Sequence, residues 1–249
     1  APRIQTHSDR EEAAEMLRHY DLTALPVVDR EDRLVGIVTV DDIMDVVEEE
    51  HTEDVQLQAA VLPEAGSYMA AGVGSLVKRR VPWLIALLAA EVVGVWFLRR
   101  YDDMLSAAIA LAFFLPVMIA TGGNSGTQSA ALLIRALATN EARLGDWLRL
   151  LGRDLLVGVV LSVVLGVLAF GLAVGIEGDP TIGLCVGLGL AAIVTMANIA
   201  GTVLPLAFKR LNMDPALMSG PFISTLVDVA GLVLYMEISF RVLRSFGQL

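Results

Sequence analysis

Residues 218–237 read MSGPFISTLVDVAGLVLYME, an apolar run of helical length with the carboxylate of Asp228 near its centre. A charge at mid-bilayer costs about 2.5–3.5 kcal/mol on insertion scales, so it should face a cavity, an ion or a partner. Ser224, Thr225 and Gly231 stand four and three residues before Asp228 and three after it, on the same helix face. No basic residue lies at comparable depth. The pattern predicts a hydrated divalent cation beside Asp228, with protonation as the alternative.

Around this run, the chain contains five apolar stretches long enough to cross about 30 Å of hydrocarbon as helices. They are Val81–Leu98, Ser106–Ala138, Leu155–Ile176, Ile182–Phe208 and Ala216–Leu243. The 249 residues are 55% hydrophobic and only 18% charged, which excludes an ordinary cytosolic enzyme, a disordered chain and a disulfide scaffold. We therefore predict an α-helical membrane protein with five transmembrane helices per subunit, which form a pore domain over residues 81–249.

Basic residues flanking these stretches predict the orientation, because cytoplasmic loops are enriched in Lys and Arg. One side would carry Lys78, Arg79, Arg80, Arg135, Arg143, Arg149, Arg153, Lys209 and Arg210, and the other only Arg99, Arg100, Arg241 and Arg244. The expected protein is a multi-pass protein of the cell membrane, surrounded by lipid. Its N-terminal head is cytoplasmic and its C-terminus lies outside.

The second apolar stretch is interrupted by TGGNSGTQSAALLIRALAT, residues 121–139. Such polar, glycine-rich backbone is tolerated at depth only where protein buries it or water wets it. A small-residue contact between helices would explain Gly122, Gly126 and Ala130 at i+4 spacing, but not Asn124 and Gln128. In the fourth stretch, Asn198 is expected to hold helices together rather than touch an ion. Glu91 in the first stretch is the other acid buried by prediction.

The N-terminal part forms an acidic head. Residues 1–77 carry five basic and 17 acidic side chains, against 13 and 11 in residues 78–249. Nucleic acid is an unexpected partner for such a head, whereas cations suit it. Glu48, Glu49, Glu50, Glu53 and Asp54 form a dense run of hard oxygen ligands suited to Mg²⁺ or Ca²⁺. The alternative is a solvated acidic face.

Within the head, the residues predict helix, strand, turn, strand and helix. Ser8 or Asp9 caps the first helix, the strands run over Ala24–Asp29 and Leu34–Val40, and the last helix starts at Asp41 or Asp42 and continues through Val47. About 45 residues are too few for a self-sufficient core, so pairing with another copy is expected.

The segments LPVVD and LVGIVTVDDI, between Leu25 and Ile43, closely resemble a CBS motif. We assign residues 1–52 to this partial α/β CBS unit. CBS motifs work in pairs and often bind adenine nucleotides or sense ions. Because only one motif is present, its companion is absent or supplied by a dimer mate, which leaves nucleotide binding open.

The chain from Leu25 onward resembles the MgtE family of Mg²⁺ channels. The resemblance rests on the acidic CBS unit followed by spans containing GGNSGTQS, NIAGTVLP and DPALMSGPFISTLVDVAGLVLY, in the family's order and spacing. It implies a homodimer whose pore lies at the subunit interface and is lined by the second and fifth spans. Asp228 matches the acid that binds fully hydrated Mg²⁺. The pore-lining positions implied by the resemblance are Gly123, Asn124, Gly126, Thr127, Gly220, Pro221 and Ser224.

The resemblance also implies regulation by cytosolic Mg²⁺, which closes the channel when it is plentiful. The matching regulatory acids are Asp42, Asp45, Glu50, Glu53 and Asp54, and residues 53–80 match the family's connecting, or plug, helix. The family's N domain and first CBS motif have no counterpart in this sequence, which suggests a truncated chain.

The leading functional prediction is a passive Mg²⁺-selective pore, in which Mg²⁺ is both the permeant and the regulatory ion. The alternative is a secondary divalent-cation transporter coupled to H⁺ or Na⁺, with Asp228 alternately protonated. An enzyme is not expected, because Ser129 has no membrane His or Lys partner, and His7, His19 and His51 all lie in the head. Asp228 would repel the ion of an anion channel.

Overall fold

A computed structural model describes residues 2–63, 69–139, 141–218 and 220–248. The chain divides into two compact units. The first comprises residues 1–56 and 63–71, and the second residues 57–62 and 72–249. Each unit is described by itself.

The first unit is a small α/β head. Its elements are β1 (Ile4–Gln5), α1 (Arg10–His19), β2 (Ala24–Val28), β3 (Leu34–Thr39) and α2 (Val40–Gln58). The predicted hairpin is confirmed: β2 pairs antiparallel with β3, and β1 pairs parallel with β2. The predicted cap is also confirmed, since the Asp9 carboxylate accepts the backbone N–H of Glu11 at 3.2 Å.

The head buries only a small core and leaves large apolar side chains of β3 and α2 exposed. Its core consists of Ile4, Ala13, Leu17, Leu25 and Ile43. By contrast, Leu34 and Ile37 of β3 are 67% and 64% exposed, and Met44 of α2 is 66% exposed. Exposed apolar side chains of this size are common in interaction surfaces. The pairing of the CBS unit with another copy stays a prediction.

The connection between the units differs from the single helix predicted over residues 53–80. Residues 53–58 instead end α2, which extends past the predicted Val47, and residues 73–80 begin α3 (Val73–Leu98). The described residues 59–63 and 69–72 are not helical. The physical reason lies in the residues themselves: Ala60 adopts a left-handed φ of 57°, Pro63 follows it, and Gly72 caps α3 in an extended conformation.

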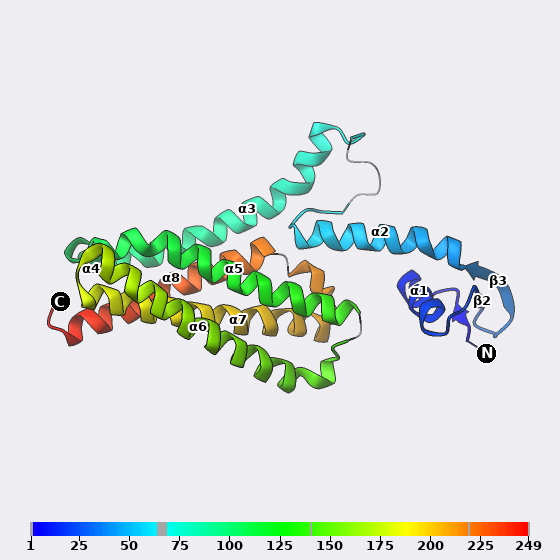
Figure 1. The fold of residues 1–249 in the computed structure, drawn as a ribbon. Coiled ribbons are helices and arrows are strands. Elements are labelled where there is room, and N and C mark those ends of the chain that lie inside the picture. The colour runs from blue at the N-terminus through cyan, green and yellow to red at the C-terminus, as the bar shows by residue number, and fades with distance from the viewer. Residues whose placement is uncertain (1, 64–68, 140, 219, 249) are drawn as a thin grey trace. The chain divides into compact units, whose positions relative to one another are not determined.

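The second unit is a helical bundle (Figure 1). After α3 come a 3-10 turn η1 (Arg99–Tyr101), α4 (Asp102–Ala107), α5 (Ala110–Ala138), η2 (Leu144–Asp146), α6 (Trp147–Glu177), α7 (Pro180–Arg210), η3 (Pro215–Leu217) and α8 (Gly220–Ser245). Among the described residues, three segments are long and apolar enough to cross a membrane: Val73–Ser106, Leu144–Glu177 and Pro180–Arg210. The helices α5 and α8 have 29 and 26 residues. The count of five spans stays a prediction.

The polar stretch of the second predicted span does not interrupt its helix. The predicted single span Ser106–Ala138 divides at Ala108 and Ile109 into α4 and α5, and α5 continues unbroken through Gly122 and Gly123. The neighbouring helices satisfy and bury part of this stretch, so an unwound segment is not needed.

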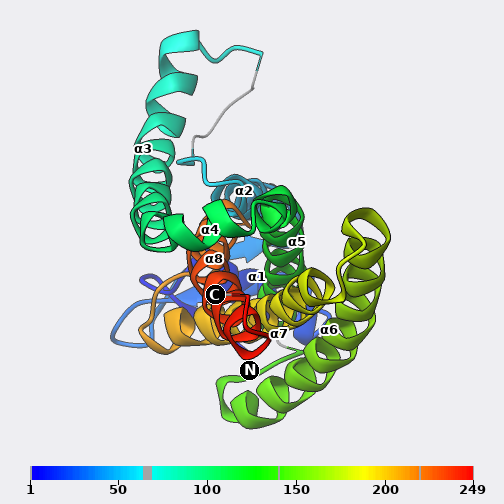
Figure 2. The same ribbon diagram turned by 90° about the vertical axis from the view of Figure 1, so that its left-hand side faces the viewer.

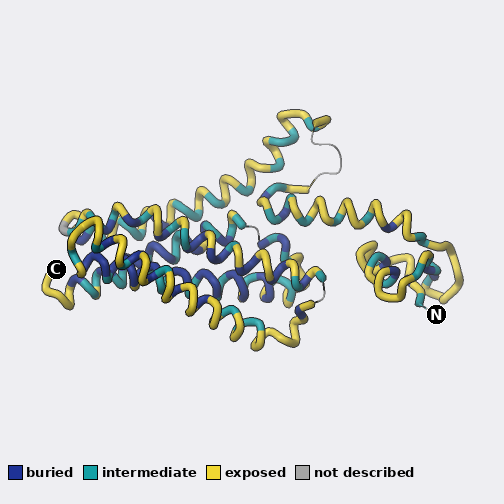
Figure 3. Tube along the Cα trace, viewed as in Figure 1, coloured by how far each residue is buried: buried dark blue, intermediate teal, exposed yellow. Residues whose placement is uncertain are grey.

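The helix α7 is the centre of the bundle and packs against α5, α6 and α8 (Figures 1 and 2). Buried residues run along most of α7, whereas α6 exposes a long apolar face (Figure 3). The helix α3 packs on α8, where Gly94 lies against Val229. The helices α5 and α8 carry the polar stretch and Asp228. Both pack against α7.

Candidate cation site

The candidate site lies where α5 passes α8. A Cβ added to Gly123 would lie 3.1 Å from the Ser224 hydroxyl oxygen and 3.5 Å from Oδ1 of Asp228. The absence of a side chain at Gly123 therefore lets the backbone of α5 approach the polar strip of α8. On the same side, Thr127 Oγ1 lies 3.3 Å from Ser224 Oγ and 3.4 Å from the carbonyl oxygen of Gly220.

Asp228 is the unusual member of this group. Its Oδ1 is buried and has no hydrogen-bond partner in the part of the chain that the structure describes. The side chain as a whole is partly buried, and Glu91 of α3 acts on it electrostatically with a like charge. A buried carboxylate oxygen without a donor is costly, so the site calls for a cation, a proton or water.

The carboxylate is not part of a metal cage. Among the described residues, no three His, Cys, Asp or Glu side chains form a group that could hold a metal ion. A dehydrated Ca²⁺ would need six to eight oxygen ligands, whereas Mg²⁺ dehydrates reluctantly and keeps several waters. A row of oxygens that runs from the Asp228 carboxylate through the Ser224 and Thr127 hydroxyls to the Gly220 carbonyl suits contacts to the water shell of a hydrated ion.

The structure separates the predicted pore-lining residues into three groups. Gly123, Thr127, Gly220 and Ser224 line the contact of α5 with α8, and Asp228 lies at the Gly123 end of this contact. In contrast, Gly126 packs inside the bundle, where its added Cβ would lie 3.1 Å from Ile223 and 3.3 Å from the carbonyl oxygen of Ala197.

Asn124 and Pro221 are both exposed on the surface of the single chain. Asn124 shares an exposed stripe of α5 with Gln128, one turn away, and with the apolar Phe113 and Val117. Uncovered amide side chains at the level of the Asp228 site require water or a second protein surface.

The sequence reasoning missed Asp154, because the predicted third span starts one residue later, at Leu155. In the structure α6 begins at Trp147, so Asp154 lies inside it. Its Oδ2 accepts hydrogen bonds from the hydroxyls of Ser129 of α5, at 2.6 Å, and Thr202 of α7. The sequence did offer one signal for this residue, namely an acid directly before a predicted apolar span.

The expected role of Asn198 is confirmed. Its Nδ2 donates to Ser125 Oγ of α5 at 2.8 Å, and its side chain packs against Gly158 of α6, where an added Cβ would lie 3.0 Å from it. Asn198 therefore joins three helices rather than reaching the Asp228 site.

The predicted regulatory acids do not converge within one chain. They are spread along α2, and two are engaged elsewhere. Asp42 accepts hydrogen bonds from the backbone and hydroxyl of Thr39, at 2.9 and 2.6 Å, and Glu50 pairs with Arg10 at 3.0 Å. The bond from the Thr39 hydroxyl lowers the pKa of the Asp42 carboxyl. These residues do not fit a built Mg²⁺ site in a single head.

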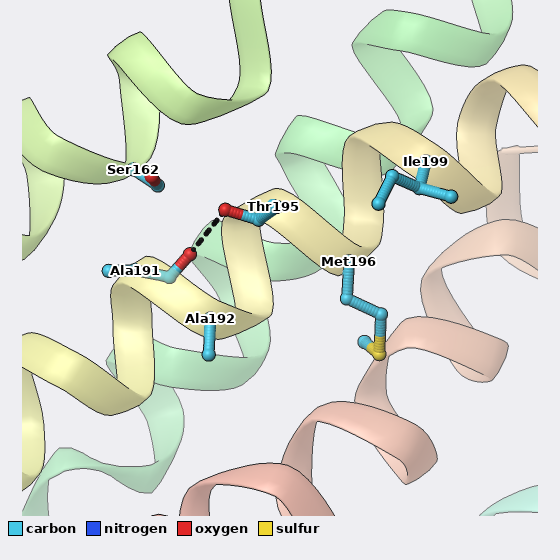
Figure 4. Close-up of a pocket in the computed structure, with 6 residues that line it drawn as sticks. All are labelled: Ser162, Ala191, Ala192, Thr195, Met196 and Ile199. Carbon is cyan, nitrogen blue, oxygen red and sulfur yellow. Dashed lines mark hydrogen bonds between the residues drawn. The ribbon is translucent and has the colours of Figure 1, made fainter. Parts of the chain in front are cut away.

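A groove of about 470 Å³ on the surface of α6 and α7 is not a competing ion site (Figure 4). Its lining hydroxyls are satisfied within their own helices: Ser162 donates to the carbonyl oxygen of Val159 at 2.8 Å, and Thr195 to that of Ala191 at 2.9 Å. No carboxylate lines it.

Comparison with known proteins supplies a family. Residues 115–238 match the family model MgtE, divalent cation transporter, and residues 2–49 match the CBS domain. The magnesium transporter MgtE of Thermus thermophilus is 44% identical over 242 residues, which are 97% of this chain and 54% of that protein. The magnesium transporters MgtE of Enterococcus faecalis and Bacillus subtilis are each 36% identical, over 98% and 95% of this chain and 53% and 52% of their own lengths. The chain spans about half the length of these curated relatives.

Proposed function

The chain belongs to the MgtE family of divalent cation transporters, and from this premise we propose that it carries Mg²⁺ across the cell membrane as a passive, Mg²⁺-selective pore. The observation that supports this function best is Oδ1 of Asp228, which has no hydrogen-bond partner among the described residues and lies next to the contact of Ser224 with Thr127. A hydrated Mg²⁺ satisfies that oxygen through its water shell and compensates the nearby charge of Glu91. The chain is a transporter rather than an enzyme in this proposal.

The pore lies between two copies of the chain. The exposed stripe of α5 carries Asn124 and Gln128 next to the Asp228 site, and a second copy converts this stripe into a wet seam. One carboxylate from each protomer then faces the ion. The membrane potential drives passage, with about 2.3 kcal/mol for each elementary charge per 100 mV.

Regulation by cytosolic Mg²⁺ acts through charge density rather than through one built site. Asp45, Glu53 and Asp54 add to the acidic surface of α2, and bound or condensed Mg²⁺ reduces the repulsion between two such heads. Replacing these three acids with their amides should weaken block by cytosolic Mg²⁺ in patch recordings. An unchanged half-blocking concentration would remove them from the regulation.

The proposed orientation has the head in the cytoplasm and the C-terminus outside. In a Cys185→Ala background, a cysteine at Gly145 should react with an impermeant maleimide only from the cytoplasmic side, and a cysteine at Phe246 only from the outside. The reverse pattern, or labelling of both from one side, contradicts the five-span topology.

The transport proposal is tested by growth of a Mg²⁺-uptake-deficient cell. The unaltered chain should restore growth at low Mg²⁺, and Asp228→Ala and Asp228→Asn should not. Glu237→Gln is the matched control, because Glu237 lies on the same helix but pairs with Arg241 at 2.7 Å. Equal growth with all four chains would remove Asp228 from the mechanism. Mg²⁺ flux that requires a Na⁺ or H⁺ gradient would favour the coupled transporter.

A further inference from the structure

Two rungs of contacts, mostly hydrogen bonds, join α5, α6 and α7 on the side of α5 away from Asp228. Ser125 and Ser129 are one turn apart on α5, Asn198 and Thr202 one turn apart on α7, and Gly158 and Asp154 one turn apart on α6. The upper rung consists of Ser125, Asn198 and Gly158, and the lower rung of Ser129, Thr202 and Asp154. We call these six residues the polar ladder.

The lower rung is centred on one carboxylate oxygen. Asp154 Oδ2 accepts both hydroxyls, and those hydroxyls lie 3.3 Å from each other. Each can also donate to the carbonyl oxygen of Asn198, at 3.4 Å from Ser129 and 3.1 Å from Thr202. Ser129 and Thr202 are 6% and 0% exposed, so without Asp154 their two hydroxyls would have to share the carbonyl oxygen of Asn198 as acceptor.

The lower rung is a cluster of hydrogen bonds rather than a second ion site. The hydroxyl protons of Ser129 and Thr202 account for the short distances between these oxygens, so the cluster needs no ion to hold it together. The function of this rung is therefore to fix the three helices relative to each other.

The polar ladder affects the cation site because it fixes the rotation of α5 about its own axis. Ser125 and Ser129 lie on nearly the opposite face of that helix from Gly123 and Thr127, which contact α8. Turning α5 to release Ser129 would move Gly123 and Thr127 against Ser224 and Asp228. There is little free space for such a movement at Gly123, since an added Cβ would lie 3.1 Å from Ser224 Oγ.

We propose that Asp154 is a positioning residue, which holds α5 through Ser129 and Thr202 in the rotation that forms the Asp228 site. The expected effect on transport rests on the proposed function. The expected effect on the rotation of α5 rests only on the contacts of the polar ladder. The required property is a hydrogen-bond acceptor of the right length at this position, since Asp154 acts here through the two hydroxyls it accepts.

The first test is independent of transport. In a Cys185→Ala chain with Thr127→Cys and Ser224→Cys, the rate of disulfide formation reports how α5 faces α8. Asp154→Asn, which keeps an acceptor oxygen, should preserve the rate. Asp154→Leu, of similar size, should slow it by about tenfold, the equivalent of one lost hydrogen bond to a charged group. An unchanged rate in Asp154→Leu overturns the proposal.

The second test uses the full chain in liposomes and compares the Mg²⁺ to Ca²⁺ flux ratio at equal amounts of folded protein. Asp154→Leu and the pair Ser129→Ala with Thr202→Val should shift this ratio, whereas Asp154→Asn should not. Ser162→Ala is the matched control, because its hydroxyl donates to the carbonyl oxygen of Val159 in the same helix α6. A lower melting temperature with an unshifted ratio shows a merely structural role and contradicts the proposal. If the unaltered chain carries no Mg²⁺, the proposed function fails, and the disulfide rates alone decide on Asp154.

Discussion

At Gly123, the backbone of α5 comes close to the functional groups of α8. The position tolerates no side chain without movement, because an added Cβ lies 3.1 Å from Ser224 Oγ and 3.3 Å from Ser224 Cβ. Ser224, and Asp228 at 3.5 Å from the same added Cβ, belong to the site that we propose for the ion. Small residues at such contacts serve the chemistry of the site as well as helix packing.

The variant Gly123→Ala should therefore lower Mg²⁺ flux while the protein stays folded. Overpacking of this kind costs about 1–3 kcal/mol, and here part of that strain displaces Ser224 and Asp228. Flux into liposomes and thermal unfolding in detergent measure the two effects. Gly171→Ala is the control, because nothing lies within 4 Å of its added Cβ. Unaltered flux in Gly123→Ala would show that the α5–α8 contact is not functional.

At the scale of elements, the capping of α2 couples the head to pH. Hydrogen bonds from Thr39 lower the pKa of Asp42, so the carboxylate stabilises the folded head above its unfolded pKa of about 3.9. This contribution is lost as pH falls through the lower, folded pKa. Hydrogen exchange of residues 34–47 in the full chain, corrected for intrinsic rates, should accelerate in acid. Asp42→Ala should be faster near neutral pH and less sensitive to acid, and identical profiles for both chains would contradict this role.

Sequence patterns predicted elements where local chemistry determines them. The Asp9 cap, the β2–β3 hairpin and the apolar helices follow from residue types a few positions apart. The role of Asn198 also followed, since a lone amide in an apolar helix needs a partner. The end of α2 at Gln58 was missed because a helix-compatible acidic run gave no reason to expect the left-handed Ala60.

The polar ladder shows why the rest could not be predicted. Along the chain, Asp154 lies 25 residues and Thr202 73 residues after Ser129. Only the packing of three helices brings these side chains together. In the sequence, Asp154 reads as the last polar residue of a loop. The separation of Gly126 from Gly123 likewise depends on the rotation of α5, which spacing alone does not specify.

At the scale of the whole molecule, the proposal requires two chains. The exposed face of α5 with Asn124 and Gln128 is the surface that a second copy would cover. In a Cys185→Ala background, Asn124→Cys should form crosslinked dimers with a short bis-maleimide in the membrane. Leu156→Cys is the matched control on α6, where Leu156 is 66% exposed on the apolar outer face. Equal crosslinking at both positions, or none at Asn124, would argue against a seam at α5.

The central claim is that the Asp228 carboxylate holds the hydrated ion in transit. Its most direct measurement is Mg²⁺ entry into liposomes that contain the purified full chain and an entrapped Mg²⁺-sensitive dye, with the membrane potential set by K⁺ and valinomycin. The account predicts potential-driven entry with the unaltered chain and with Glu237→Gln, and none above empty liposomes with Asp228→Asn. Full entry through Asp228→Asn would contradict it.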